Sequence, residues 1–359
     1  MAQSASDEPP QASADFLRVA VRPGAAPALC WTNFLSADDM AVVLHEAQRL
    51  VRCPGGGCTH FIASGDTPVC QLESMAIAVA TWHMSRCDNR CCTRGSDFGF
   101  GAEWWVQIRE PNEPLSTHWD CDEYLKSETG EHIPPYVATV TYLTAVGAPT
   151  LVLPVAADSN GRAFAATAAP LSAFTSFPVR GKHLAFDGRL LHGAPYDGPV
   201  EEEEGAAADA SPPSAAPLRV TILINLWIDH CPKGVERLPL PLVAAITGHR
   251  EISIDDDDDD DEERQIARPP PPPAPPMIVG ASASVAPPHH VPSLEDDAEW
   301  REFSIGSFHH QPVSLRPLDD LWTRPDESAH FLLYAPSELR LPADGDGVVG
   351  EADGGGSDA

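Results

Sequence analysis

The sequence predicts a mainly β fold of the α+β kind, an antiparallel sandwich or barrel with helices at its N-terminal end. Between about residues 100 and 230, short runs rich in β-branched and aromatic residues are separated by Pro, Gly and Asp. No helical pattern lies between these runs, which favours antiparallel strands over alternating β-α units. Helical periodicity precedes them, within residues 36–86.

Two helices are predicted in that N-terminal stretch. Residues 36–52 open with Ser-x-x-Asp, a variant of the capping box, and then space their apolar residues along one helical face. A second helix is predicted from about residue 68 to residue 86. The motif CPGGGC between them indicates a loop, because three successive glycines support neither helix nor strand. We expect the helices to cover one outer face of the sheet.

Five runs are predicted as strands. They are AEWWVQIR (102–109), YVATVTYLT (136–144), TLVLPV (150–155), KHLAF (182–186) and RVTILINLWI (219–228). In the last run the even positions, from Val220 to Ile228, are all aliphatic and suit packing against helices. The odd positions carry a cation, a hydroxyl and an amide, so that face either meets water or lines a polar cavity.

Composition limits the folded part of the 359 residues to one domain with long insertions. Many of the 37 prolines and 26 glycines gather in a few low-complexity runs. We expect a disordered leader (1–14), a folded domain (15–250) whose core spans about 100–230, an acidic and Pro-rich low-complexity linker (251–298) and a C-terminal segment (299–341) that packs on the domain. The tail, 342–359, is also expected to be disordered.

The formal net charge is −30, and much of it lies in Asp255–Asp261 and Glu201–Glu204. An acidic surface repels phosphate backbones, so the composition disfavours nucleic acid as a partner. The sequence shows neither a secretory signal nor an apolar stretch of membrane-spanning length. We therefore expect an intracellular protein, cytoplasmic or nuclear, that is not secreted and has no membrane partner. The oligomeric state is not predicted.

One short motif could carry metal chemistry. In LSTHWDCDEYL (115–125), His118 and Asp120 alternate along an extended segment, so both side chains face the same side. His192, after a strand-like run and before the turn-like Gly-Ala-Pro, could add a second imidazole. Two nitrogens and one oxygen on one face leave positions open for further ligands, as in non-haem Fe(II) oxygenases. The alternative is a solvated loop and a histidine that caps a turn.

An arginine on the polar face of the last predicted strand strengthens the metal interpretation. Arg219 lies on the polar face of the last predicted strand, where a guanidinium needs a carboxylate partner and binds it through two hydrogen bonds. Tyr142, on another strand, could add a hydroxyl donor. Trp105 and Gln107 share a strand face and could line the same pocket. No catalytic residue is expected beyond the metal ligands.

Together, His118-x-Asp120, His192 and Arg219 resemble the Fe(II)- and 2-oxoglutarate-dependent dioxygenases, especially the prolyl-hydroxylase-like branch. The match covers about residues 100–230 and includes Tyr142-Leu143-Thr144, which is similar to a Tyr-Leu-Asn strand of that branch. Arg219 lies 27 positions after His192, further than in the family. The interval holds residues 199–217, whose composition is typical of an inserted loop.

The resemblance implies a double-stranded β-helix, or jelly roll, with Fe(II) bound by His118, Asp120 and His192. It also implies that 2-oxoglutarate rests its far carboxylate on Arg219 and Tyr142. The expected reaction is a hydroxylase-type oxidation by dioxygen that produces succinate and carbon dioxide. The substrate, a protein side chain or a small metabolite, is not predicted.

Other interpretations remain open at this point. A cupin-like metal-dependent enzyme without 2-oxoglutarate would share the ligands but would not need Arg219. A non-catalytic jelly-roll binding module, or a scaffold acting through the acidic and Pro-rich segments, is a further alternative. Cysteines 53, 58, 87, 91 and 92, with His60, could form a structural zinc site, although their spacing favours free thiols. Asp122 and Glu123 are interpreted as outer or solvent-facing residues.

Overall fold

The computed structural model of the chain describes residues 28–86, 99–157, 163–165, 171–194, 217–248, 272–285, 289–290, 301–304, 312–315 and 328–334. The predicted leader and tail, the acidic run and almost all of the predicted inserted loop lie outside the described residues.

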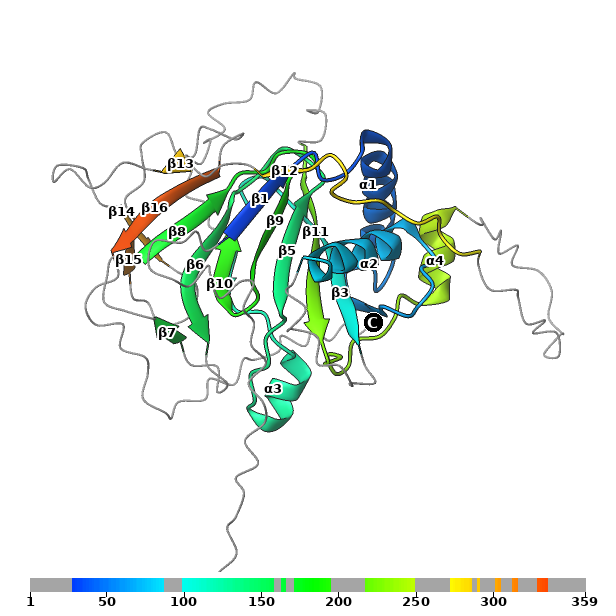
Figure 1. Ribbon diagram of the computed structural model, residues 1–359, viewed down its shortest axis with the longest axis horizontal. Helices are drawn as coiled ribbons and strands as arrows, with labels where there is room; N and C mark the ends of the chain where they lie inside the picture. Colours follow the sequence, from blue (N-terminus) through cyan, green and yellow to red (C-terminus); the bar gives the residue numbers. More distant parts are fainter. Residues whose placement is uncertain are drawn as a thin grey trace, which may run out of the picture.

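The core is a sandwich of two antiparallel sheets (Figure 1). Four neighbouring strands of the first sheet run in the order β9-β5-β11-β3, and four of the second in the order β8-β6-β10-β4. Strands that follow one another in the chain mostly lie in different sheets, which is the double-sheet topology of a jelly roll. The strands are β3 (Phe100–Arg109), β4 (Leu115–His118), β5 (Val137–Tyr142), β6 (Thr150–Ala157), β8 (Leu171–Ser176), β9 (His183–Asp187), β10 (Leu190–Ala194) and β11 (Arg219–Ile228).

Further strands widen both sheets. The first sheet continues through β1 and β12 at one edge and β2 at the other. The second continues beyond β8 through β16, β15 and β14, while β7 pairs with β6 and β13 with β16. These strands are β1 (Ala28–Thr32), β2 (His60–Ala63), β7 (Ala163–Ala165), β12 (Ser284–Val285), β13 (His289–His290), β14 (Arg301–Ser304), β15 (Pro312–Leu315) and β16 (Ser328–Tyr334).

The predicted helices form and lie beside the first sheet. In Figure 1, α1 (Ala37–Arg52), α2 (Gln71–Met84) and a third helix, α4 (Leu240–Thr247), gather on the side of β3 and β11. Helix α1 begins at Ser36, whose Oγ accepts a hydrogen bond from the Asp39 amide at 3.1 Å, as the capping motif predicts. A short helix that the sequence analysis missed, α3 (Glu123–Thr129), follows β4.

Strand β11 separates two apolar cores, as the different character of its even and odd positions predicts. Val220, Ile222 and Ile224 belong to the core that β11 shares with α1, α2 and α4. Leu223 belongs to the smaller core between the two sheets. Arg219 and Asn225, on the same face as Leu223, are 3% and 2% exposed, so the polar face lines the interior and does not meet water.

Residues 272–285, which lie within the stretch predicted as an acidic and Pro-rich linker, contact the helical core. Met277 and Val279 are buried in the helical core, and the Met277 amide donates to Ser74 Oγ at 3.1 Å. Ser74 in turn donates to the carbonyl of Pro275 at 2.9 Å. An extended Pro-rich chain lacks internal hydrogen bonds, so its free backbone groups and interspersed apolar residues can dock on a helix.

Within the described part of the chain, no helix has both the length and the apolar character needed to cross a lipid bilayer.

Candidate metal centre

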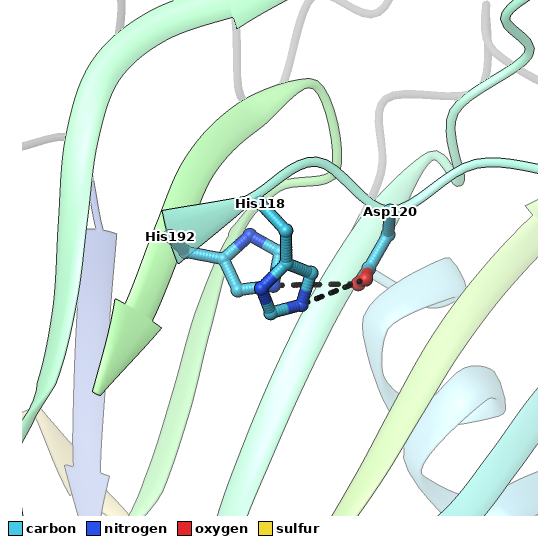
Figure 2. A group of neighbouring side chains, drawn as sticks. All are labelled: His118, Asp120 and His192. Atoms are coloured by element: carbon cyan, nitrogen blue, oxygen red, sulfur yellow. Dashed lines mark ion pairs between the residues drawn. The ribbon is translucent and has the colours of Figure 1, made fainter. Parts of the chain in front are cut away.

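Two paired strands and the loop after one of them bring the predicted ligands together (Figure 2). His118 ends β4 and His192 lies inside β10, and the two are direct partners in the antiparallel register. The expectation that His192 follows a strand and begins a turn is wrong, because Gly193 and Ala194 continue β10. Asp120 stands in the loop between β4 and α3, and its carboxylate faces both imidazoles.

The three side chains converge on one small volume. Nε2 of His118 lies 3.5 Å from Oδ1 of Asp120, and Nε2 of His192 lies 3.5 Å from Oδ2. All three ligand atoms lie within 4.8 Å of one another. A first-row divalent metal binds nitrogen and oxygen ligands at about 2.0–2.2 Å, so adjacent ligands lie about 3 Å apart. A small contraction of this group would therefore hold such an ion.

The backbone fixes which nitrogen of each imidazole faces that volume. Nδ1 of His118 lies 2.9 Å from the carbonyl of Ser116, and Nδ1 of His192 lies 3.0 Å from the carbonyl of Leu190. A carbonyl oxygen can only accept, so each Nδ1 carries a proton and each neutral ring presents the lone pair of Nε2 to Asp120. Two lone pairs and a carboxylate facing one another repel unless a cation lies between them. The donor set therefore fits a divalent metal.

Electrostatics keep the carboxylate available. Burial raises the pKa of Asp120, but the nearby His192 and His118 and the hydrogen bond from Asn225 outweigh it and lower that pKa to about 2. Burial lowers the pKa of His118, but Asp120 outweighs burial and raises that pKa. The Asp120 carboxylate accepts a hydrogen bond from the protonated ring and adds a nearby negative charge. Burial lowers the pKa of His192. At neutral pH, Asp120 is ionised and His192 is neutral, as metal ligation requires.

Arg219 occupies the same interior face, further toward the start of β11. Its guanidinium donates to the carbonyl of Ala148 at 3.1 Å, to Gln107 Oε1 at 3.2 Å and to Thr150 Oγ1 at 3.2 Å. Its aliphatic stem lies against Gly147, where an added Cβ would come within 2.7 Å of two Arg219 carbons. Burial lowers the pKa of Arg219.

Among the described residues, the hydrogen-bond partners of Arg219 are all neutral and no carboxylate pairs with it. A buried guanidinium without a counter-charge is costly, which makes it a ready site for the carboxylate of a ligand.

Tyr142 lies beside Arg219 but is occupied by other groups. Its hydroxyl lies 2.9 Å from the carbonyl of Ser176, to which it donates, and 2.8 Å from Thr150 Oγ1. The Arg219 guanidinium carbon lies 5.7 Å from the centre of the Tyr142 ring. The predicted role of Tyr142 as a direct donor to a ligand would need one of these bonds to be exchanged, and it stays a prediction.

The acidic neighbours of the motif have different surroundings. Asp122 is 1% exposed and caps α3, since its Oδ1 accepts from the Leu125 amide at 2.9 Å and its Oδ2 from His230 at 2.9 Å. Of the two alternatives predicted for these residues, Asp122 is thus a buried outer residue of the site, whereas Glu123 is exposed. Trp105 packs on the inner core and Gln107 contacts Arg219, as their shared strand face predicts.

The cysteines form no second metal group in the part of the chain that the structure describes. His118, Asp120 and His192 make up the one cluster there that could hold an ion. Cysteines 30, 53, 58, 70, 121 and 231 form no disulfide bond with one another. Cys87, Cys91 and Cys92 lie outside the described residues.

Sequence reasoning missed two residues of the site. Thr150 connects Arg219 with Tyr142, and Glu103 contacts Asn225, which in turn contacts Asp120. A signal for Glu103 exists in the sequence, because it is a carboxylate within the apolar run AEWWVQIR and alternates with Trp105 and Gln107 on one face.

The fold and the site define the chain as a jelly-roll protein with a candidate centre of two histidines and one carboxylate. No protein-family model and no curated protein matches the sequence. Its structural neighbours include a prolyl-4-hydroxylase of Pseudomonas putida, with 15% identity over 63% of this chain and 96% of that chain and a TM-score of 0.32.

Two other neighbours are described as depending on 2-oxoglutarate or holding it. SnoN, a non-haem α-ketoglutarate-dependent epimerase of nogalamycin biosynthesis, is 14% identical over 59% of this chain and 82% of that one, with a TM-score of 0.35. HygX of Streptomyces hygroscopicus, solved with nickel and 2-oxoglutarate, is 12% identical over 56% and 82%, with a TM-score of 0.32. Similarity this distant establishes no activity, so the function of this chain rests on its own site residues.

Proposed function

We propose that this chain is an Fe(II)- and 2-oxoglutarate-dependent dioxygenase that oxidises a protein side chain or a small metabolite. The observation that carries the proposal is the convergence of two imidazole lone pairs and an ionised carboxylate within 4.8 Å of one another. Nitrogen and oxygen ligands of this kind on one face leave positions open for a co-substrate, which is the pattern of non-haem iron oxygenases.

The co-substrate follows from Arg219. A 2-oxo acid that chelates the metal needs an anchor for its far carboxylate, and Arg219 is a buried cation on the interior face of the strand that also carries Asn225. Asn225 touches Asp120, so β11 reaches from the anchor to the ligands. In this arrangement Arg219 would bind the far carboxylate, with Thr150 and Gln107 holding the guanidinium in place.

The site residues have limited and distinct roles in this mechanism. His118, Asp120 and His192 would hold the metal. Hydrogen bonds to backbone carbonyls would orient the two histidines, and the hydrogen bond from Asn225 would orient Asp120. When bound, Fe(II), 2-oxoglutarate and dioxygen would supply the oxidising chemistry, in which one oxygen atom enters the substrate C–H bond and the other enters succinate as 2-oxoglutarate loses carbon dioxide. The apolar core between the sheets excludes water from the inner end of the site.

The test is an anaerobic titration of the metal-free protein with Fe(II) and then 2-oxoglutarate, followed through the visible metal-to-ligand charge-transfer band. We expect a band in the wild type, its loss in His118→Ala and Asp120→Ala, and a shift to higher 2-oxoglutarate concentration in Arg219→Ala. His45→Ala, at an exposed position of α1, is the matched control and should retain the band.

Other outcomes would contradict the proposal in different ways. Iron binding without the band would indicate a cupin-like enzyme with another co-substrate. Absence of iron binding in the folded wild type would indicate a non-catalytic jelly-roll module.

A further inference from the structure

Asp120 has few groups that fix its orientation. It lies in a loop, outside β4 and α3. Among the described residues, Asn225 is the one group besides the two imidazoles that contacts its carboxylate, donating from Nδ2 to Oδ2 at 3.2 Å. The imidazoles present lone pairs when neutral and cannot then donate to it. The rotation of the carboxylate therefore depends on Asn225.

The amide of Asn225 is itself oriented by a second carboxylate. The same Nδ2 lies 3.4 Å from Oε2 of Glu103, the direct cross-strand partner of Asn225 in the register of β3 and β11. An amide NH₂ group has two hydrogens, so it can serve both acceptors at once. A flipped amide would turn its carbonyl oxygen toward the Asp120 carboxylate and toward Oε2 of Glu103, an oxygen that already accepts from Trp227 Nε1, and this arrangement is repulsive. Glu103 thus selects the orientation in which Asn225 donates to Asp120.

A rigid aromatic side chain fixes Glu103 in turn. Nε1 of Trp227 donates to Oε2 of Glu103 at 2.8 Å. Trp227 is 1% exposed and Glu103 9%, so neither side chain has room to move freely. The same Glu103 oxygen accepts from both Trp227 and Asn225, which links the tryptophan to the metal ligand through three successive contacts.

We propose that Asn225 is the positioning residue of the metal ligand Asp120 and that Glu103 and Trp227 hold Asn225 in its donating orientation. This inference rests on the proposed function, because it assigns these residues to the same metal centre. Partners that orient a ligating carboxylate alter metal affinity by about 10–100-fold when they are removed.

The experiment measures Co(II) binding to the metal-free full-length protein by calorimetry, together with the visible d–d spectrum at saturating Co(II). Asn225→Leu removes both donors at similar volume, and we expect its Kd to rise by about 10–100-fold with an altered spectrum. Trp227→Phe keeps an aromatic ring but loses the donor, and we expect a smaller rise in Kd in the same direction.

Thr139→Val is the matched control. Thr139 lies on the neighbouring strand β5, is buried and donates to the carbonyl of Ile224 at 2.8 Å, so the variant loses a buried hydrogen bond without touching Asp120. We expect a wild-type Kd and spectrum. The spectrum separates positioning from general destabilisation, because a merely loosened fold would not change the ligand geometry of the bound state.

Several results would overturn the inference. A folded Asn225→Leu with the wild-type Kd and spectrum would do so, and so would an equal loss of affinity in Thr139→Val. If Asn225→Leu does not fold, wild-type affinity and spectrum in Trp227→Phe would overturn it. A wild type that binds no Co(II) would remove both the inference and the proposed function, whereas the preceding results leave the proposed function intact.

Discussion

His118 and His192 face each other across paired strands, with ring centroids 4.5 Å apart. Their approach depends on Gly193, because a Cβ there would lie 2.9 Å from Thr117 Cα and 3.0 Å from the Leu115 carbonyl oxygen. Both are backbone atoms of β4 and cannot yield unless the strand moves. Gly193 therefore sets the spacing between the strands that carry the two histidines.

Gly193→Ala is expected to separate β4 from β10 and so to pull His118 away from His192. Overpacking of this kind costs about 1–3 kcal/mol of unfolding free energy. We expect the Co(II) Kd to rise about 10-fold in the folded variant, since displaced ligands no longer share one volume. Urea unfolding and calorimetric titration measure the two effects.

Gly57→Ala is the control for that substitution. A Cβ at Gly57 meets no described atom within 4 Å, so both the unfolding free energy and the Kd should stay close to the wild type. Equal Co(II) affinity in Gly193→Ala and wild type would contradict the role assigned to Gly193.

Gly193 also shows which features of the site the sequence could predict and which it could not. In HGAP the glycine precedes alanine and proline, which is typical of a turn, yet its function here is to admit a neighbouring strand. Close approach between strands depends on tertiary pairing, which no local pattern encodes. By contrast, β11 matches its predicted bounds, because its β-branched alternation is both long and local.

The predicted ligands could be found because His118 and Asp120 alternate along a short extended segment and His192 follows them in a recognisable order. The contacts that orient them could not, since Asn225 and Asp120 are 105 positions apart and their contact arises only when the sheets close. The short helix α3 escaped prediction for another reason. Its 7 residues are mostly polar, so its start depends on the cap at Asp122 and not on an apolar period.

Metal affinity should fall as the pH falls, and His118 should govern the change. The pKa of His118 is raised above its ordinary value of about 6.5, so its proton competes with the metal near neutral pH. Asp120, with a pKa of about 2, stays ionised across this range. The lowered pKa of His192 keeps that ring neutral. We expect Co(II) affinity to drop about 10-fold per pH unit below the His118 pKa.

Calorimetric titrations between about pH 8 and about pH 5.5, repeated in buffers of different ionisation enthalpy, measure both the affinity and the protons released. Release of one proton per metal near neutral pH is the expected result. A Kd that does not vary across this range would show that proton competition at His118 is absent.

Arg219 should discriminate between 2-oxo acids by their far carboxylate. In the metal-loaded protein, 2-oxoglutarate at about 100 times its Kd should stabilise the fold by about 2.7 kcal/mol. 2-Oxobutyrate keeps the chelating end but lacks the second carboxylate, so it should stabilise far less at the same concentration. Arg219→Gln should abolish this difference, because its neutral amide cannot pair with the carboxylate.

Thermal unfolding with each 2-oxo acid tests this prediction in the wild type and in Arg219→Gln. If both acids raise the Tm equally in the wild type, Arg219 does not bind the far carboxylate.

A buried pair of histidines, separate from the metal centre, predicts that the unfolding free energy decreases in acid. Nε2 of His83, on α2, lies 3.0 Å from Nε2 of His183, on β9, and Nδ1 of His183 lies 2.8 Å from Thr141 Oγ1. The ring of Phe34 stacks on His183 with centroids 3.9 Å apart. Two neutral rings share one hydrogen bond, whereas a further proton would set two donors face to face. Burial lowers the pKa of His83 to about 3 and that of His183 well below its ordinary value.

The sign of the effect follows from these lowered pKa values. The unfolded chain binds protons at these histidines below about pH 6.5, while the folded chain does not, so stability is complete above that pH and is lost as the pH falls. Each histidine contributes about 1.4 kcal/mol of loss per pH unit in that range. His83→Gln removes one titrating group, and the pH dependence of its unfolding free energy, measured with urea between about pH 7.5 and about pH 5, should be shallower by that amount. An unchanged slope in a folded His83→Gln would place the acid sensitivity in other groups, because glutamine binds no proton in this range.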